Sequence, residues 1–250
     1  MTIHLFGLLQ RRFTAKETYQ YIVHHWHDWF PCLPSYQAYN NRLNKLHWQF
    51  EVLVADLTCQ LSYSDSYADV CLTDSLPIIV SKRPYQAKVA RSFADKGYCA
   101  TKRLYYHGLK LHFLGRDRYQ GLPQPEFVHL SAASANDLTE LKPLLPKLTN
   151  RRVIADKIYA SAPLNEQLAS QRVEIITPVK LKQGQKQLDA ADTLFSRFVS
   201  SVRQPVEAFF HWLNEKTHIQ IASKVRSADG LFLHCYGRLA AALFILVFNP

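Results

Sequence analysis

The sequence is poor in the residues that build special structures. Its 250 residues include 8 glycines and 12 prolines, too few for a collagen-like or low-complexity chain. The five cysteines are scattered, odd in number and never in a CxxC pair. This pattern argues against a disulfide framework or a zinc ribbon and predicts a reducing cytoplasm. Hydrophobic residues make up 48% of the chain, which is too many for a disordered protein.

Export signals and long hydrophobic runs are also scarce. In the opening residues, MTIHLFGLLQRRF, the arginines follow the apolar stretch, which is the reverse of their order in a signal peptide. The apolar run at residues 239–248 is ten residues long, whereas a membrane-spanning helix needs roughly 20. We therefore expect a buried helix here and no membrane partner.

Negative charge is nearly absent from one segment. Residues 81–118 hold ten Lys and Arg against two Asp, so they carry +8 of the net charge of +10. A concentrated positive charge attracts phosphate, although charge patterning alone also allows a solvated basic loop. The cations expected to contact phosphate are Lys82, Arg83, Lys102, Arg103 and Lys110. A second group, which would provide another path for a nucleic acid, comprises Arg203, Lys224 and Arg226.

Hydrophobic periodicity predicts an α/β fold. Residues 1–65 show helical spacing broken by two prolines at 31–34, which indicates a small N-terminal helical region. Over residues 66–250 the patterns alternate, which favours a mixed sheet flanked by helices. The expected strands are residues 68–80, 104–114, 126–130, 152–155 and 173–178. The expected helices are residues 138–148, with Asn136 as N-cap, 163–171, 192–217 and 228–248. The expected loops are residues 82–103 and 183–192.

Three carboxylates stand out by their context. Asp74 interrupts an apolar strand, where an ionised group is costly unless it is paired, metal-bound or at an exposed end; a turn at residues 74–77 is the alternative. Asp156 ends a second apolar run, at a strand end where α/β proteins bind ligands, or else it caps a helix. Glu207 lies four residues after Arg203, which also fits an exposed ion pair. Together the three supply hard oxygen ligands for two Mg²⁺ ions.

The helix that carries Glu207 contains a proline, Pro205. We expect its apolar stripe to pack on the sheet; the stripe is Leu194, Phe198, Val202, Val206, Phe209 and Leu213. An interior proline predicts either a kink near residues 201–203 or a helix that begins there, with Pro205 in its first turn. We favour the second arrangement, in which Arg203 precedes the helix and reaches a phosphate instead of Glu207.

Several short motifs occur in a specific order and spacing. They are DSLP at residues 74–77, KGYCATK at 96–102, YHGLKLH at 106–112, Asn136 with Asp137, DKIY at 156–159, and RQPVE at 203–207 followed by Phe210. In these pieces the sequence resembles bacterial insertion-sequence transposases of the DDE class. The resemblance implies an RNase H-like catalytic core with Asp74, Asp156 and Glu207 as the acidic triad, and the gaps of 82 and 51 residues suit such a core.

The resemblance implies Mg²⁺-dependent DNA cleavage and strand transfer, with two ions and Mn²⁺ as a substitute. The implied partners are double-stranded DNA at the element ends and target DNA, in the bacterial cytoplasm and associated with the nucleoid. A catalytically inactive DNA-binding remnant and a Mg²⁺-dependent nuclease with the same core are the alternatives. The oligomeric state is left open, with a homo-oligomer on DNA as one outcome, and so are the terminal repeats and the target preference.

Overall fold

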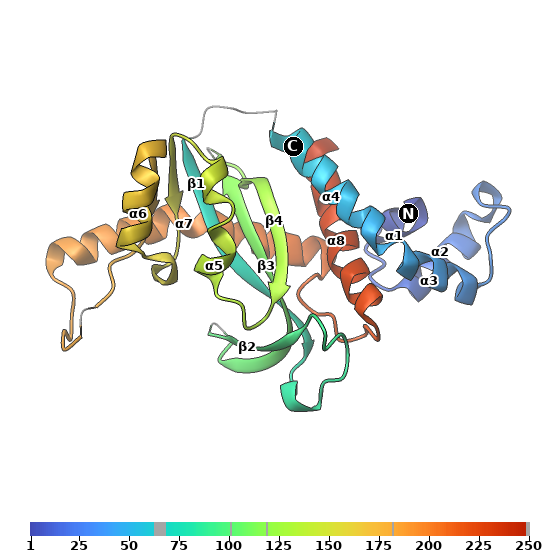
Figure 1. Cartoon of the computed structure of the whole chain (residues 1–250). Helices are drawn as coiled ribbons and strands as arrows, with labels where there is room; N and C mark the ends of the chain where they lie inside the picture. Colours follow the sequence, from blue (N-terminus) through green and yellow to red (C-terminus); the bar gives the residue numbers. More distant parts are fainter. Residues whose placement is uncertain (63–68, 101, 119, 182, 249–250) are drawn as a thin grey trace.

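A computed structural model describes residues 1–62, 69–100, 102–118, 120–181 and 183–248 (Figure 1). Within these residues, six strands form one mixed sheet with helices on both faces, so the expected α/β class is confirmed. The strands are β1 (Val70–Ser81), β2 (Asp95–Cys99), β3 (Leu104–Arg116), β4 (Gln124–Ala132), β5 (Arg151–Ile154) and β6 (Val173–Ile176).

Strand β1 lies at the centre of the sheet, in the order β2-β3-β1-β5-β6. It runs antiparallel to β3, from the pair Cys71↔Arg116 to the pair Ser81↔His107. On its other side β1 pairs in parallel with β5, which pairs in parallel with β6. The long strand β3 pairs with β2 along its first half and with β4 along its second half. The sheet is therefore antiparallel on one side of β1 and parallel on the other.

The alternation of side chains along β1 separates two hydrophobic cores. Leu72, Leu76 and Ile78 face the core that contains side chains of α4, α7 and α8. Cys71 faces the smaller core formed with α5, α6 and the segment between them. Because Asp74 has the same parity as Leu72 and Leu76, its side chain points to the face that α7 covers.

The helices at the two ends of the chain pack together. Figure 1 shows α4 and α8 side by side, with the N-terminal helix α1 next to them. Among the described residues, α8 is the one helix long and apolar enough to cross a membrane, but most of it is buried, as in a core helix. The helices are α1 (Thr2–Leu9), α2 (Ala15–His25), α3 (Tyr36–Lys45), α4 (His47–Ser62), α5 (Asp137–Leu141), α6 (Ala162–Leu168), α7 (Ala190–Thr217) and α8 (Ala228–Phe248).

Helix α7 continues without interruption through Pro205. The expectation that a helix begins near Arg203 is therefore wrong. The stripe predicted to face the sheet is buried at Val206, Phe209 and Leu213, whereas Leu194 and Phe198 are 71% and 64% exposed. The reason is length, because α7 begins well before it reaches β1 and β5, the strands on which it packs.

Other differences from the sequence predictions have local causes. The helix expected over residues 138–148 ends at Leu141, because Pro143 and Pro146 cannot continue it, although Asn136 caps it as expected. Strand β2 lies inside residues 82–103, which were expected to be a loop, and its order comes from pairing with β3. Ala68, the expected first residue of the first strand, lies outside the described residues.

Candidate active site

Asp74 lies in the middle of β1, opposite Phe113 of β3. The strand continues through residues 74–77, so the alternative of a turn is wrong. The Ser75 backbone N–H donates to Asp74 Oδ1 at 2.8 Å, and the side chain is 22% exposed. A carboxylate that is this buried needs a cationic partner.

Arg203 of α7 is that partner. Its guanidinium donates to Asp74 Oδ2 and, over 2.7 Å, to Glu207 Oε1 one helical turn away. The Arg203 side chain is mostly buried, whereas the Glu207 side chain is 60% exposed. The expectation that Arg203 precedes the helix and leaves Glu207 unpaired is thus wrong. One arginine brings Asp74 and Glu207, which are far apart in sequence, to the same place.

Asp156 follows β5 on the parallel side of β1. The paired register ends at Leu72 and Ile154, and Asp74 and Asp156 each lie two residues beyond that pair. The negative charge of Asp156 acts on Asp74 across this end of the strand pair. Asp156 also caps the following turn, because the Lys157 backbone N–H donates to its Oδ1 at 2.7 Å. The sequence offered capping and ligand binding as alternatives, and the capping bond is present.

The electrostatics of Asp74 reflect these neighbours. Burial raises the pKa of Asp74 to about 6, while the Arg203 guanidinium and the Ser75 N–H oppose that rise. The negative charges of Asp156 and Asp137 add smaller increases to the pKa. The charges of Asp156 and Asp137 therefore act on Asp74 directly, whereas Glu207 is linked to Asp74 through Arg203.

A second polar cluster lies on the opposite face of the sheet. Asp137, at the start of α5, accepts from Lys110 Nζ at 3.2 Å and lies 3.7 Å from His112 Nδ1. Burial is the main cause that lowers the pKa of His112, to about 4. The sequence analysis placed Asp137 only in a motif with Asn136. Its position one residue after the helix cap Asn136 was the feature that could have pointed to it. Lys110, expected to contact phosphate, is mostly buried in this ion pair.

The donor chemistry of the candidate site suits a hard divalent cation. Three carboxylates supply the oxygen ligands that Mg²⁺ and Mn²⁺ accept. In the described part of the chain, however, no three His, Cys, Asp or Glu side chains are gathered closely enough to hold a metal ion. The cause is visible at Asp74 and Glu207, because Arg203 lies between them.

The remaining predicted phosphate contacts fall in two places. Lys82 and Arg83 follow β1, and Lys102 and Arg103 lie in the turn between β2 and β3. All four are exposed, and none forms an ion pair with a carboxylate that the structure describes.

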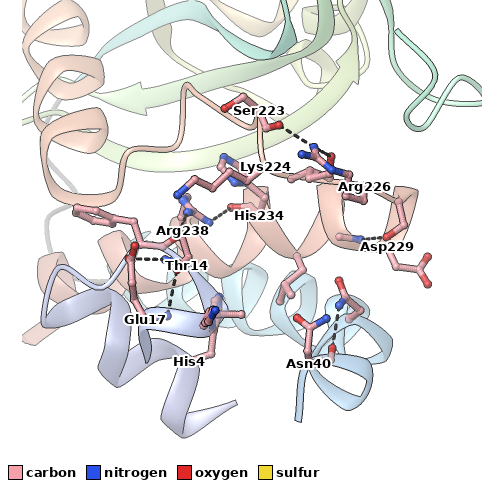
Figure 2. A pocket seen from close by; sticks show the side chains of 18 of the residues that line it. His4, Thr14, Glu17, Asn40, Ser223, Lys224, Arg226, Asp229, His234 and Arg238 are labelled. Carbon is pink, nitrogen blue, oxygen red and sulfur yellow. Dashed lines mark hydrogen bonds between the residues drawn. The ribbon is translucent and has the colours of Figure 1, made fainter. Parts of the chain in front are cut away.

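Lys224 and Arg226 line a separate cleft of about 1180 Å³. Figure 2 shows the cleft between the loop after α7, helix α8 and the N-terminal helices. Lys102 Nζ donates to Gln220 Oε1 at 2.6 Å, so the two groups of cations are connected through the loop that follows α7.

The family model of the transposase DDE domain matches residues 69–244. The chain belongs to this family of DDE transposases. The matched range spans the whole sheet with helices α5 to α7 and most of α8, and it contains all three candidate acids. Membership of this family implies that the protein binds DNA as its substrate. DDE transposases generally use divalent metal ions. No curated protein and no solved structure matches the chain.

Proposed function

We propose that this transposase cuts DNA at the ends of an insertion sequence and joins the cut ends to target DNA, with Asp74, Asp156 and Glu207 as its catalytic acids. The observation that carries the proposal is the bridge from Asp74 through Arg203 to Glu207. The charge of Asp156, which follows β5, also acts on Asp74. The sequence motifs selected the same three residues, which come from β1, from the turn after β5 and from α7.

The three carboxylates would hold two Mg²⁺ ions, or Mn²⁺ as a substitute. When bound, such ions activate the attacking oxygen and stabilise the leaving oxygen of a phosphoryl transfer. Arg203 must first release at least one carboxylate, because it now occupies the space between Asp74 and Glu207. Once released, its planar guanidinium can bind the phosphate of the DNA that is being cut.

The proposed reaction has two displacements at phosphorus. In the first, a water oxygen attacks a phosphodiester at the element end, and the leaving oxygen becomes the 3′-OH of that end. In the second, the oxygen of this 3′-OH attacks a target phosphodiester and displaces one strand of the target. The side chains position the phosphates and balance their charge, and no covalent bond forms between the protein and DNA.

The test uses the DNA that flanks the gene at its own locus. Labelled duplexes carrying each flank are incubated with the full chain, a plasmid target, and either Mg²⁺ or EDTA. We expect nicking and joining to the plasmid with Mg²⁺ and neither with EDTA. Nicking without joining would favour the nuclease alternative, and binding without nicking would favour the inactive remnant.

A further inference from the structure

Four side chains form a row on the exposed face of the β2–β3 hairpin. Lys96 Nζ lies 4.6 Å from the ring centre of Tyr85 and 4.5 Å from that of Tyr105. The rings of Tyr105 and Tyr98 follow with centres 4.9 Å apart. We call Tyr85, Lys96, Tyr105 and Tyr98 the tyrosine row. Its outer members, Tyr85 and Tyr98, are 80% and 52% exposed.

The fold holds this row in a fixed position. Tyr98 and Tyr105 are direct cross-strand partners in the β2–β3 register. On the other face of the hairpin, Tyr106 is fully buried in a small core with Cys99 and Ile79. The backbone of Gly97 approaches Ala133 so closely that a Cβ would lie 2.7 Å from the Ala133 carbonyl oxygen. The rings are therefore mounted on a well-packed hairpin.

Packing explains only part of the row. A cross-strand pair of tyrosines stabilises a hairpin, which accounts for Tyr98 with Tyr105. It does not account for Tyr85, which comes from the short turn Pro84–Gln86. The Tyr85 hydroxyl accepts a hydrogen bond from Lys96 Nζ at 2.5 Å, and the residue is still 80% exposed. Exposed aromatic rings gathered in one place are typical of a binding surface.

The charges around the row indicate the chemistry of its ligand. The exposed cations of this region form no ion pair with any carboxylate that the structure describes, and they are Lys82, Arg83, Lys88, Arg91, Lys96, Lys102 and Arg103. Like charges crowded without counter-charges repel one another until an external polyanion binds. Rings between such cations are the combination that binds single strands, because bases stack on the rings while phosphates meet the cations.

We propose that the tyrosine row binds unpaired nucleotides of DNA, with bases stacked on Tyr85 and Tyr98. Duplex DNA cannot use the ring faces, because its bases are already stacked on one another inside the helix. The surface therefore distinguishes a frayed or single-stranded flank from an intact duplex. The inference rests on the proposed function only in naming DNA as the nucleic acid.

The test measures binding in EDTA, where no cleavage occurs. Three labelled probes of equal length are used: a single strand, the same strand with abasic sites in place of its bases, and a blunt duplex. The variant is the double substitution Tyr85→Ala and Tyr98→Ala, and its matched control is Tyr85→Phe with Tyr98→Phe, which keeps both rings. Thermal melting of all three proteins checks that each one is folded.

We expect the alanine variant to lose about 10-fold or more in affinity for the single strand, since stacking on one ring contributes at least a factor of about 5. The phenylalanine control should bind the single strand like the wild type. The alanine variant should bind the abasic strand and the duplex with unchanged affinity.

Unchanged affinity for the single strand would overturn the proposal, as would an equal loss for the abasic strand. A polyglutamate peptide serves as a fourth probe. If the alanine variant lost affinity for this peptide but not for the single strand, the tyrosine row would be assigned to an acidic protein instead. Ring-dependent binding of the single strand in a protein that never nicks DNA would leave this inference standing and contradict the proposed function.

Discussion

The sheet end and the helical end of the molecule each bury an arginine, but the two arginines have different kinds of partner. At the sheet, Arg203 faces two carboxylates, one of them 60% exposed. At the helical end, Arg238 of α8 is buried and forms no ion pair with a described carboxylate. Its guanidinium donates instead to the main-chain oxygens of Thr217 and Phe13, at 2.9 and 2.6 Å.

The histidines extend this contrast. Burial, with smaller contributions from Arg238 and the N-terminal amine, lowers the pKa of His4 to about 3. Both ring nitrogens of His4 lack a hydrogen-bond partner among the residues that the structure describes. Burial also lowers the pKa of His234, which bonds to the Ile219 carbonyl oxygen. At the helical end, burial favours the neutral form of His4 and His234, and Arg238 is bonded to main-chain oxygens. At the sheet end, Arg203 is paired with two carboxylates, one of which is exposed to solvent. Ions and phosphates can reach the proposed site at the exposed side of the Arg203 ion pairs.

The largest effect should follow the loss of one carboxylate at the sheet end. Asp74→Asn removes the negative charge of a proposed metal ligand. Because metal ions contribute several kcal/mol to phosphoryl transfer, nicking should fall by at least about 10³-fold. DNA binding in a mobility-shift assay should be retained. The control is Asp56→Asn, at an exposed position of α4 in the helical end. Equal activity of Asp74→Asn and wild type would refute the catalytic role of Asp74.

The next effect concerns the helix that carries Arg203 and Glu207. Phe209 is buried and stacks on Phe113 of β3 with ring centres 4.5 Å apart. Phe209→Ala should lower the free energy of unfolding by about 3–5 kcal/mol, as measured by urea denaturation. Phe198→Ala, in the same helix but at an exposed position, is the matched control and should change it little. Similar losses of stability in both variants would mean that the whole length of α7 is packed in solution.

Acid should destabilise the helical end through His4. Because the pKa of His4 is lower in the folded chain than the ordinary 6.5, the unfolded chain binds the proton more tightly, and stability falls as the pH drops below 6.5. By pH 5 this single group costs about 2 kcal/mol. His4→Leu should remove that part of the acid loss in urea titrations at pH 7 and pH 5. His25→Leu, at an exposed position of α2, should leave the loss unchanged; an unchanged loss in His4→Leu would show that other groups cause it.

The smallest expected effect is on the salt dependence of DNA binding, and it distinguishes the two groups of cations that could contact DNA. Neutralising Lys82, Arg83, Lys102 and Arg103 together should flatten the dependence of log affinity on log salt by up to roughly 0.9 for each DNA phosphate that is no longer neutralised. The counterpart variant neutralises Lys224 and Arg226 in the cleft at the helical end. A flattened slope only in the second variant would move the DNA path to that cleft.

The sequence predicted correctly those helices and strands whose pattern is set by neighbouring residues in the chain. The apolar run of β1, the helical spacing of α7 and the Asn136 cap are each encoded within a few neighbouring residues, and all three are present. Strand β2 was missed because DKGYC has neither alternation nor an apolar run, and only its partner β3 makes it a strand.

The candidate site shows the same limit. Its three acids were selected by context and by resemblance, but the guanidinium that joins two of them was expected to point away. The contact between Arg203 and Asp74 spans 129 residues, so no local pattern records it. The exposed start of α7 was missed for a similar reason, since periodicity shows which side of a helix is apolar but not how far the sheet extends beneath it.

The pairing of α4 with α8 sets an order on folding during synthesis. Tyr236 of α8 donates to Glu51 of α4 at 3.0 Å, and the two helices share one hydrophobic core. A ribosome that adds about 5–20 residues per second needs roughly 10 to 30 s to pass from the end of α4 to the start of α8. During that time α4 lacks α8, the helix against which it packs most extensively, although β4 can already contact it. Part of the apolar surface of α4 therefore stays uncovered until α8 emerges and completes the core.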